Sequence, residues 1–203
     1  IPIRYQWVKP EAPTELVILL HGYQERAERM SRLVLPHLPE TSAVLIPNAP
    51  FPVPIVTNES LKEAYAWYFY DTKIQKMMLS PDTAVSMIVQ AIVSVEATKL
   101  PIRIIGFSQG GYFASILAQR LPNVRHVIAL SAGFPERYIR GNPNFRLDAG
   151  HGALDVVCNY AAAVSEHKAL VSNGWSGEFI TLPDTAHRID RAMQKEITRI
   201  IRR

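Results

Sequence analysis

The sequence contains a single cysteine, Cys158, among its 203 residues. One cysteine cannot form an internal disulfide, and this usage is typical of proteins from a reducing compartment. No apolar run approaches the roughly 18 residues that a membrane-spanning helix needs. The first ten residues, IPIRYQWVKP, do not show the charged-then-apolar layout of a signal peptide. We therefore expect a cytoplasmic protein without stable membrane insertion.

The sequence also has little excess of either charge. It contains 22 Lys and Arg residues and 18 Asp and Glu residues, which gives a net charge of +4. Basic residues gather only between Arg188 and Arg202, at three- and four-residue steps opposite an apolar stripe. This pattern predicts a C-terminal helix with a solvated outer face, and contact with an acidic partner is the alternative. Because no interleaved aromatics or known module accompany it, we expect no nucleic-acid binding.

Metal-ligand spacings are missing as well. The histidines and carboxylates show no H-E-x-x-H or comparable motif, so we expect neither a metal nor an organic cofactor. There is no repeat, low-complexity tract or linker. A hydrophobic content of 48% over this length suits one domain spanning residues 1–203.

Short apolar runs alternate with helix-like stretches along the chain. The runs that predict strands are 16–20, 43–46, 102–105, 127–130, 178–182 and, more weakly, 144–148. Residues 3–8 alternate and predict an antiparallel edge strand. Helical patterns cover 25–35, a stretch from Ser80 to about 95, 110–121 and 157–173. This alternation predicts an α/β fold with a mainly parallel sheet covered on both faces. The proline-rich segment 47–70 is expected to be irregular.

In a parallel sheet, functional groups gather at the carboxyl ends of the strands. His21 follows the first apolar run, and Ser108 follows the run at 102–105. Asp155 follows the weak strand, and His187 follows the last one. A serine, an acid and a histidine thus occur at three strand ends in that order.

Ser108 lies in GFSQGG, residues 106–111, which matches the G-x-S-x-G nucleophile elbow. The serine of such an elbow sits in a strained strand-to-helix turn, where Gly106 and Gly110 avoid a collision. The turn exposes the hydroxyl and aims the Gln109 backbone N–H at a developing oxyanion. A plain tight turn is the alternative interpretation.

A serine hydroxyl needs a base, and His187 suits this role best by position and order. The other histidines have simpler explanations in helices, strands or loops; His21, for example, would shape the oxyanion loop. Asp155 is the preferred partner carboxylate, expected where a helix opens. Other acids that could take this place are Asp148, Asp184 and Asp190.

The second oxyanion donor is expected from the loop after the first apolar run, at the backbone N–H of Tyr23. Aromatic residues of the segment 51–70 could line an acyl pocket, namely Phe51, Trp67 and Phe69. The alternative is that these aromatics belong to the core, as buried aromatics commonly do.

Several motifs together resemble the α/β-hydrolases of the acyl-protein thioesterase, phospholipase and carboxylesterase family. They occur in family order as LLHG (19–22), PNAP (47–50), AWYFYD (66–71), GFSQGG (106–111), LSAGFP (130–135) and HGALDVV (151–157), followed by His187. The resemblance implies an α/β-hydrolase fold, a triad of Ser108, Asp155 and His187, and oxyanion donors at Tyr23 and Gln109. Gln24 departs from the family, which commonly has glycine there.

These observations predict a serine hydrolase that cleaves small-molecule carboxylic esters or thioesters through an acyl-enzyme. Two other functions stay open. The chain could be a non-catalytic member that binds a ligand or protein in the same cleft, or it could be a serine peptidase. The sequence leaves the acyl chain length, the leaving group and the oligomeric state undetermined.

Overall fold

The computed structural model describes residues 3–71, 73–74, 76–134, 138–139, 141 and 144–203. Its centre is a seven-stranded sheet in the order β1-β3-β2-β10-β11-β12-β13. These strands are β1 (Tyr5–Val8), β2 (Glu15–Leu20), β3 (Ser42–Pro47), β10 (Ile102–Phe107), β11 (Val124–Leu130), β12 (Arg146–Gly152) and β13 (Phe179–Leu182). Only β1 is antiparallel to its neighbour, and it lies at the sheet edge as predicted. The predicted mainly parallel α/β sheet is confirmed.

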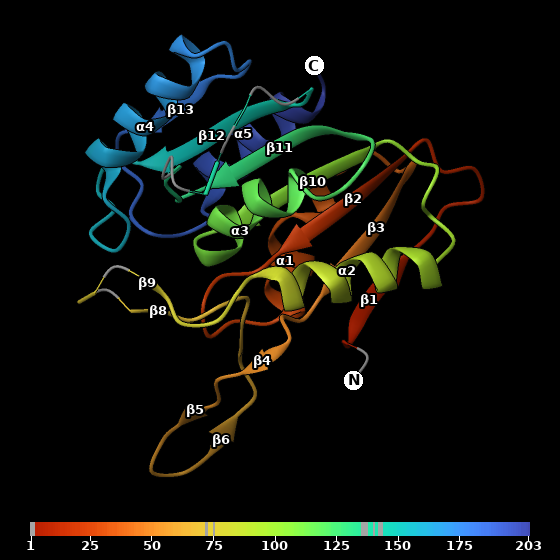
Figure 1. The fold of residues 1–203 in the computed structure, drawn as a ribbon, viewed down its shortest axis with the longest axis horizontal. Coiled ribbons are helices and arrows are strands. Elements are labelled where there is room, and N and C mark those ends of the chain that lie inside the picture. Colours follow the sequence, from red (N-terminus) through yellow and green to blue (C-terminus); the bar gives the residue numbers. More distant parts are fainter. Residues whose placement is uncertain (1–2, 72, 75, 135–137, 140, 142–143) are drawn as a thin grey trace.

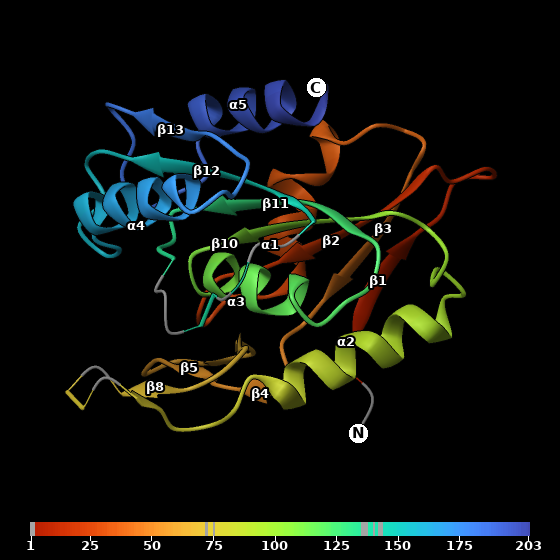
Figure 2. The same cartoon turned by 45° about the horizontal axis from the view of Figure 1, so that its top comes forward.

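Helices cover both faces of this sheet (Figures 1 and 2). They are α1 (Ala27–Leu33), α2 (Asp82–Ser94), α3 (Gln109–Ala118), α4 (Tyr160–Ser172) and α5 (Arg191–Ile201), with a short 3-10 turn η1 (Leu35–His37). Figure 2 shows α5 above the sheet and α2 and α3 beneath it. None of the helices in the described part of the chain has the length and apolar character needed to span a bilayer.

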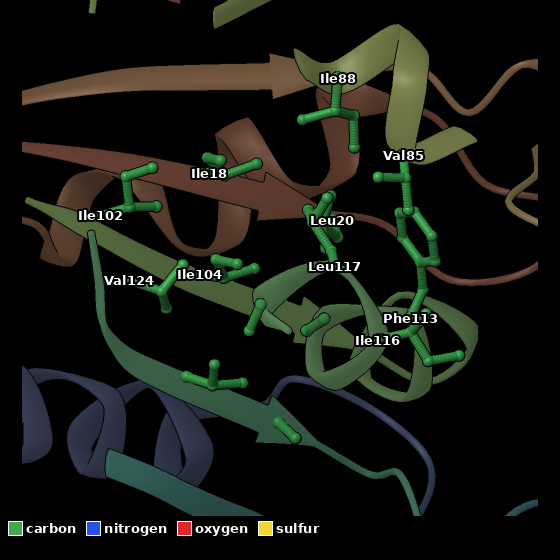
Figure 3. Packing of buried hydrophobic residues seen from close by; sticks show 14 of the residues in the cluster. Ile18, Leu20, Val85, Ile88, Ile102, Ile104, Phe113, Ile116, Leu117 and Val124 are labelled. Atoms are coloured by element: carbon green, nitrogen blue, oxygen red, sulfur yellow. The ribbon is translucent and has the colours of Figure 1, made fainter. Parts of the chain in front are cut away.

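The strands are apolar on both sides because each side faces a helix layer. On β2, Leu16, Ile18 and Leu20 pack toward α2 and α3, whereas Val17 and Leu19 pack toward α1 and α5. Figure 3 shows the first of these layers, where strand residues meet side chains of α2 and α3. Burying both faces explains why these runs are continuous rather than alternating.

The C-terminal helix has the predicted two-sided character. Met193, Ile197 and Ile200 are buried against the sheet, and Asp190 caps the helix by accepting a hydrogen bond from the Met193 N–H at 3.1 Å. The helix predicted from Ser80, α2, starts slightly later. That helix begins at Asp82, and the Ser80 hydroxyl accepts from the Asp82 N–H at 3.1 Å from just outside the first turn.

The segment 47–70 is more regular than its prolines suggest, so that expectation is wrong. It forms two short antiparallel pairs, β4 (Phe51–Pro52) with β7 (Tyr65–Ala66) and β5 (Ile55–Val56) with β6 (Leu61–Lys62). A third pair follows, β8 (Tyr70–Asp71) with β9 (Lys76–Met77). Two-residue pairs tolerate proline because few ladder hydrogen bonds depend on its missing N–H. These hairpins project from the sheet (Figure 1).

Two further boundaries differ from prediction. The weak strand at 144–148 is β12, which continues to Gly152 and therefore includes His151. Asp155 does not open a helix; it lies in a turn, and α4 begins only at Tyr160 with Asn159 as its cap. Hydrogen bonds to the Asp155 carboxylate stabilise that turn, and side-chain bonds of this kind compete with helix formation.

Candidate active site

Ser108 stands at the sharp turn between β10 and α3. Its backbone has φ 51° and ψ −121°, a conformation that costs a non-glycine residue on the order of 1–3 kcal/mol. A Cβ at Gly106 would collide with the Gly110 carbonyl, and one at Gly110 would collide with the Leu20 carbonyl. The two glycines therefore allow the close approach that the elbow requires. The Ser108 N–H donates to the Leu130 carbonyl at 2.9 Å and fixes the turn to β11.

His187 brings the predicted serine and acid into one chain of hydrogen bonds. Its Nε2 lies 3.0 Å from the Ser108 Oγ, and its Nδ1 lies 2.7 Å from the Asp155 Oδ2. With Asp155 ionised, Nδ1–H donates to the carboxylate, so Nε2 is free to accept the serine proton. The three residues come from turns after β10, β12 and β13, at the same edge of the sheet.

Asp155 is held as a carboxylate inside the protein. Its side chain is fully buried, and burial alone would raise the pKa. Hydrogen bonds from His187 and from the Cys158 and Val157 N–H groups outweigh this and hold the pKa below its usual range. The Asp155 Oδ1 accepts from those two amides at 2.9 and 2.8 Å, which leaves Oδ2 for the histidine.

The alternative acids have other partners or positions. Asp148 is buried within β12 and accepts from His126 Nε2 at 2.8 Å and Arg146 Nε at 2.7 Å. Asp190 caps α5 and accepts from the Thr185 hydroxyl at 2.9 Å, whereas Asp184 is exposed. The structure thus brings Asp155, and none of these three, to His187.

Tyr23 and Gln109 both line the same cavity as Ser108. Gln109 is the first residue of α3, where a backbone N–H has no partner within the helix. In the part of the chain that the structure describes, neither the Tyr23 nor the Gln109 N–H donates a hydrogen bond. Both donors are therefore free to bind an oxyanion formed at Ser108.

The Gln109 side chain has a role that the sequence did not reveal. Its Oε1 accepts from the Trp67 N–H at 2.9 Å, and its Nε2 donates to the Tyr68 carbonyl at 2.9 Å. The residue after Ser108 thereby fixes the aromatic segment 67–69 beside the turn.

His21 is a neutral structural histidine. Its Nε2 accepts from the Ala49 N–H at 3.0 Å, so Nδ1 carries the proton and donates to the Gly22 carbonyl at 2.7 Å. Burial lowers the pKa of His21 to about 4. Trp67 Nε1 donates to the His21 carbonyl at 2.8 Å. These contacts set the path of the loop that presents Tyr23.

A cavity of about 540 Å³ opens at Ser108. Its walls are mainly aromatic and apolar: Tyr23, Tyr68, Phe69, Tyr70, Met77, Gln109, Tyr112, Ile116, Tyr138, Ile139, Val157, Cys158 and Glu166. Of the three predicted pocket aromatics, only Phe69 lies in this wall. Trp67 is fully buried and stacks on Phe113 with ring centres 5.0 Å apart, as the core alternative expects. Phe51 packs behind Phe69, with ring centres 5.6 Å apart.

Sequence reasoning missed most of the cavity wall. Tyr68 and Tyr70 flank the predicted Phe69, so the aromatic segment itself carried a signal for them. Tyr112 lies one helical turn after Ser108, which also places it near the nucleophile. Glu166 comes from α4, and no local pattern links it to the site.

Across the described residues, no group of three or more His, Cys, Asp or Glu side chains is arranged to hold a metal ion.

Comparison with known proteins agrees with this architecture. The family model described as Phospholipase/Carboxylesterase matches residues 7–203. No curated protein sequence matches the chain. Among solved structures, esterase PE8 is 22% identical, with a TM-score of 0.78 over 100% of this chain and 99% of that one.

Two other structures show the same fold at lower identity. Acyl-protein thioesterase 2 of Zea mays is 20% identical, with a TM-score of 0.72 over 98% of this chain and 97% of that one. The Bacillus cereus carboxylesterase is 12% identical, with a TM-score of 0.76 over 98% and 93%. The family match covers nearly the whole chain, which has the mainly parallel α/β-hydrolase sheet. The chain therefore belongs to the phospholipase and carboxylesterase family of α/β-hydrolases.

Proposed function

We propose that this protein is a serine hydrolase that cleaves small-molecule carboxylic esters or thioesters through an acyl-enzyme. The family and the solved relatives support an esterase or thioesterase type of hydrolase. The observation that carries the finer proposal is the hydrogen-bonded chain from Ser108 through His187 to Asp155. It begins at the wall of an aromatic cavity.

The first half of the reaction forms the acyl-enzyme. The Ser108 Oγ attacks the acyl carbonyl carbon while His187 Nε2 takes the hydroxyl proton. The carbonyl oxygen becomes an oxyanion that the Tyr23 and Gln109 N–H groups bind. Ionised Asp155 stabilises the resulting imidazolium. When the carbonyl re-forms, the bond to the alcohol or thiol breaks, and His187 returns its proton to the leaving group.

The second half repeats these steps with water. His187 removes a proton from a water molecule, which attacks the acyl carbon of the Ser108 ester. The oxyanion forms at the same two amides, and its collapse returns the proton to the Ser108 Oγ and releases the carboxylic acid. The aromatic and apolar cavity favours apolar acyl groups of modest size.

Hydrolysis of short- and medium-chain p-nitrophenyl esters tests this proposal, with Ser108→Ala as the comparison. Loss of the nucleophile should reduce kcat by several orders of magnitude. Equal activity of the two proteins would exclude Ser108 as the nucleophile. Inactivity of both, together with no labelling of wild type by a fluorophosphonate, would favour the non-catalytic alternative. Cleavage of peptide amides but not esters would favour the peptidase.

A further inference from the structure

Glu25 folds back onto the loop that presents Tyr23. Its Oε2 accepts from the Gly22 N–H at 2.9 Å. Its own backbone carbonyl accepts from the Tyr65 N–H at 3.1 Å, and the Gln24 N–H donates to the Tyr65 carbonyl at 3.0 Å. The loop from Gly22 to Glu25 is therefore fixed by its own carboxylate on one side and by Tyr65 on the other.

The Glu25 carboxyl group also lies beside the residue that precedes the nucleophile. A Cβ built on Gly22 would lie 3.1 Å from the Glu25 carboxyl group and 3.3 Å from the Phe107 ring. Phe107 also packs against His187, with ring centres 5.0 Å apart and the planes tilted by 39°. Glu25 and the His187 imidazole thus both lie near Phe107.

The charges of these two residues influence each other. Burial raises the pKa of the Glu25 carboxyl group, while Arg29, the Gly22 N–H and His187 act to lower it. Electrostatic coupling is reciprocal. An ionised Glu25 therefore attracts the imidazolium that the proposed reaction generates at His187.

Other charged groups around this pair are few. Arg29, on α1, forms an ion pair with Glu25, and its Nε lies 2.8 Å from the Glu25 Oε1. The Nε–H does not point at that oxygen closely enough to form a hydrogen bond. Its guanidinium carbon lies 5.5 Å from the centre of the Phe107 ring. His187 also faces Asp155 in the turn after β12, and His151 of β12 interacts with both. Glu25 is thus a carboxylate, besides Asp155, that acts on His187.

We propose that Glu25 is a positioning residue that couples the oxyanion loop to the general base. Its carboxylate holds the Gly22 N–H, and so the Tyr23 amide, and its charge stabilises the His187 imidazolium near Phe107. This inference rests on the proposed function and adds to it a residue that makes no contact with the substrate.

Glu25→Gln separates the two effects, because the amide oxygen still accepts from the Gly22 N–H while the charge is lost. The kcat/KM of p-nitrophenyl acetate is measured from pH 5 to 9. Loss of the negative charge should move the acidic midpoint of the profile to lower pH. The plateau of kcat should fall several-fold with little change in KM. Glu28→Gln is the matched control, since Glu28 lies three residues further along the chain, is exposed on α1, and pairs with Arg26 at 3.1 Å.

Glu25→Asp is the complementary variant. It keeps the charge but is too short to reach the Gly22 N–H in the same way. We expect its acidic midpoint to stay near that of wild type while kcat falls about tenfold through a displaced oxyanion loop. This variant also preserves a test if Glu25→Gln does not fold, as judged by circular dichroism.

The inference is overturned if Glu25→Gln has the same pH profile as Glu28→Gln and wild type. It is equally overturned if Glu25→Asp loses no activity. Failure of the proposed function looks different, because Ser108→Ala would then match wild type or wild type would cleave no ester. Both results are obtained from the same assay.

Discussion

The Nδ1 of His187 lies 2.7 Å from the Oδ2 of Asp155, and that carboxylate is fully buried while its other oxygen accepts two backbone amides. The carboxylate can therefore neither rotate away nor exchange its partner for water. This fixed acceptor selects the histidine tautomer whose Nε2 faces Ser108.

Asp155→Asn should reduce kcat about 10⁴-fold with only a small change in the free energy of unfolding. The Asn oxygen can still accept from the Val157 and Cys158 amides, so the turn is retained. The Asn NH₂ group would then face His187 Nδ1 and favour the wrong tautomer. Ester hydrolysis and urea unfolding measure the two effects. A fall of less than tenfold in kcat would show that another acid supports His187.

Stability should fall as the pH drops from about 7 toward 4. Burial lowers the pKa of His21 to about 4 and also lowers the pKa of His151 and His167. Below pH 6.5 the unfolded chain binds protons at these residues and the folded protein does not, so protonation favours unfolding. His21, with a folded pKa of about 4, contributes a slope of about 1.4 kcal/mol per pH unit, and His151 and His167 act in the same direction.

Urea unfolding between pH 7 and 5 measures this slope. His21→Gln should be less stable than wild type at pH 7 but should show a smaller slope, because one of the three groups is gone. A wild-type stability that does not change between pH 7 and 5 would contradict the prediction.

Gln24 adopts φ 55°, in the left-handed region that favours glycine. Gln24→Gly should therefore be at least as stable as wild type, whereas Gln24→Val should lose about 1–2 kcal/mol because a β-branched side chain clashes in this conformation. Chemical unfolding of the two variants tests this. Equal stability of both would mean that the loop relaxes to another backbone conformation.

Cys158 should react slowly with thiol reagents despite lining the cavity. Burial raises the pKa of its thiol to about 11, although hydrogen bonds with Tyr112 and Ser108 act to lower it. At pH 8 the thiolate is then scarce, and iodoacetamide labelling should be about 100-fold slower than for a free cysteine. Mass spectrometry follows the labelling, with the urea-unfolded chain as control. Rapid labelling of the folded protein would contradict the prediction.

The fold and the order of the site residues could be predicted because they depend on local patterns. Runs such as 16–20 are apolar on both faces, and the glycines around Ser108 are a requirement of the turn itself. The turn that holds Asp155 was mistaken for the start of a helix, since the acid binds amides two and three residues ahead in either case. Asn159 was the available sign of where α4 begins, since Asn is a preferred cap and its side chain accepts from the Ala162 N–H.

Other features arise only from tertiary packing. Trp67 lies in the core rather than in the cavity wall because its indole reaches the His21 carbonyl and its ring meets Phe113. Glu166 enters the cavity from a helix more than fifty residues beyond Ser108. The departure at Gln24 was visible in the sequence, but its left-handed backbone was not.

The backbone at Ser108 has a consequence for the history of this chain. A serine with φ 51° makes the folded state less stable than it would be with glycine at the same place. Loss of the hydroxyl through Ser108→Gly would therefore remove activity and strengthen the fold in one step. Without selection for activity, substitutions at this position would favour a more stable and inactive protein. Under the proposed function, selection for turnover is therefore what retains a serine there.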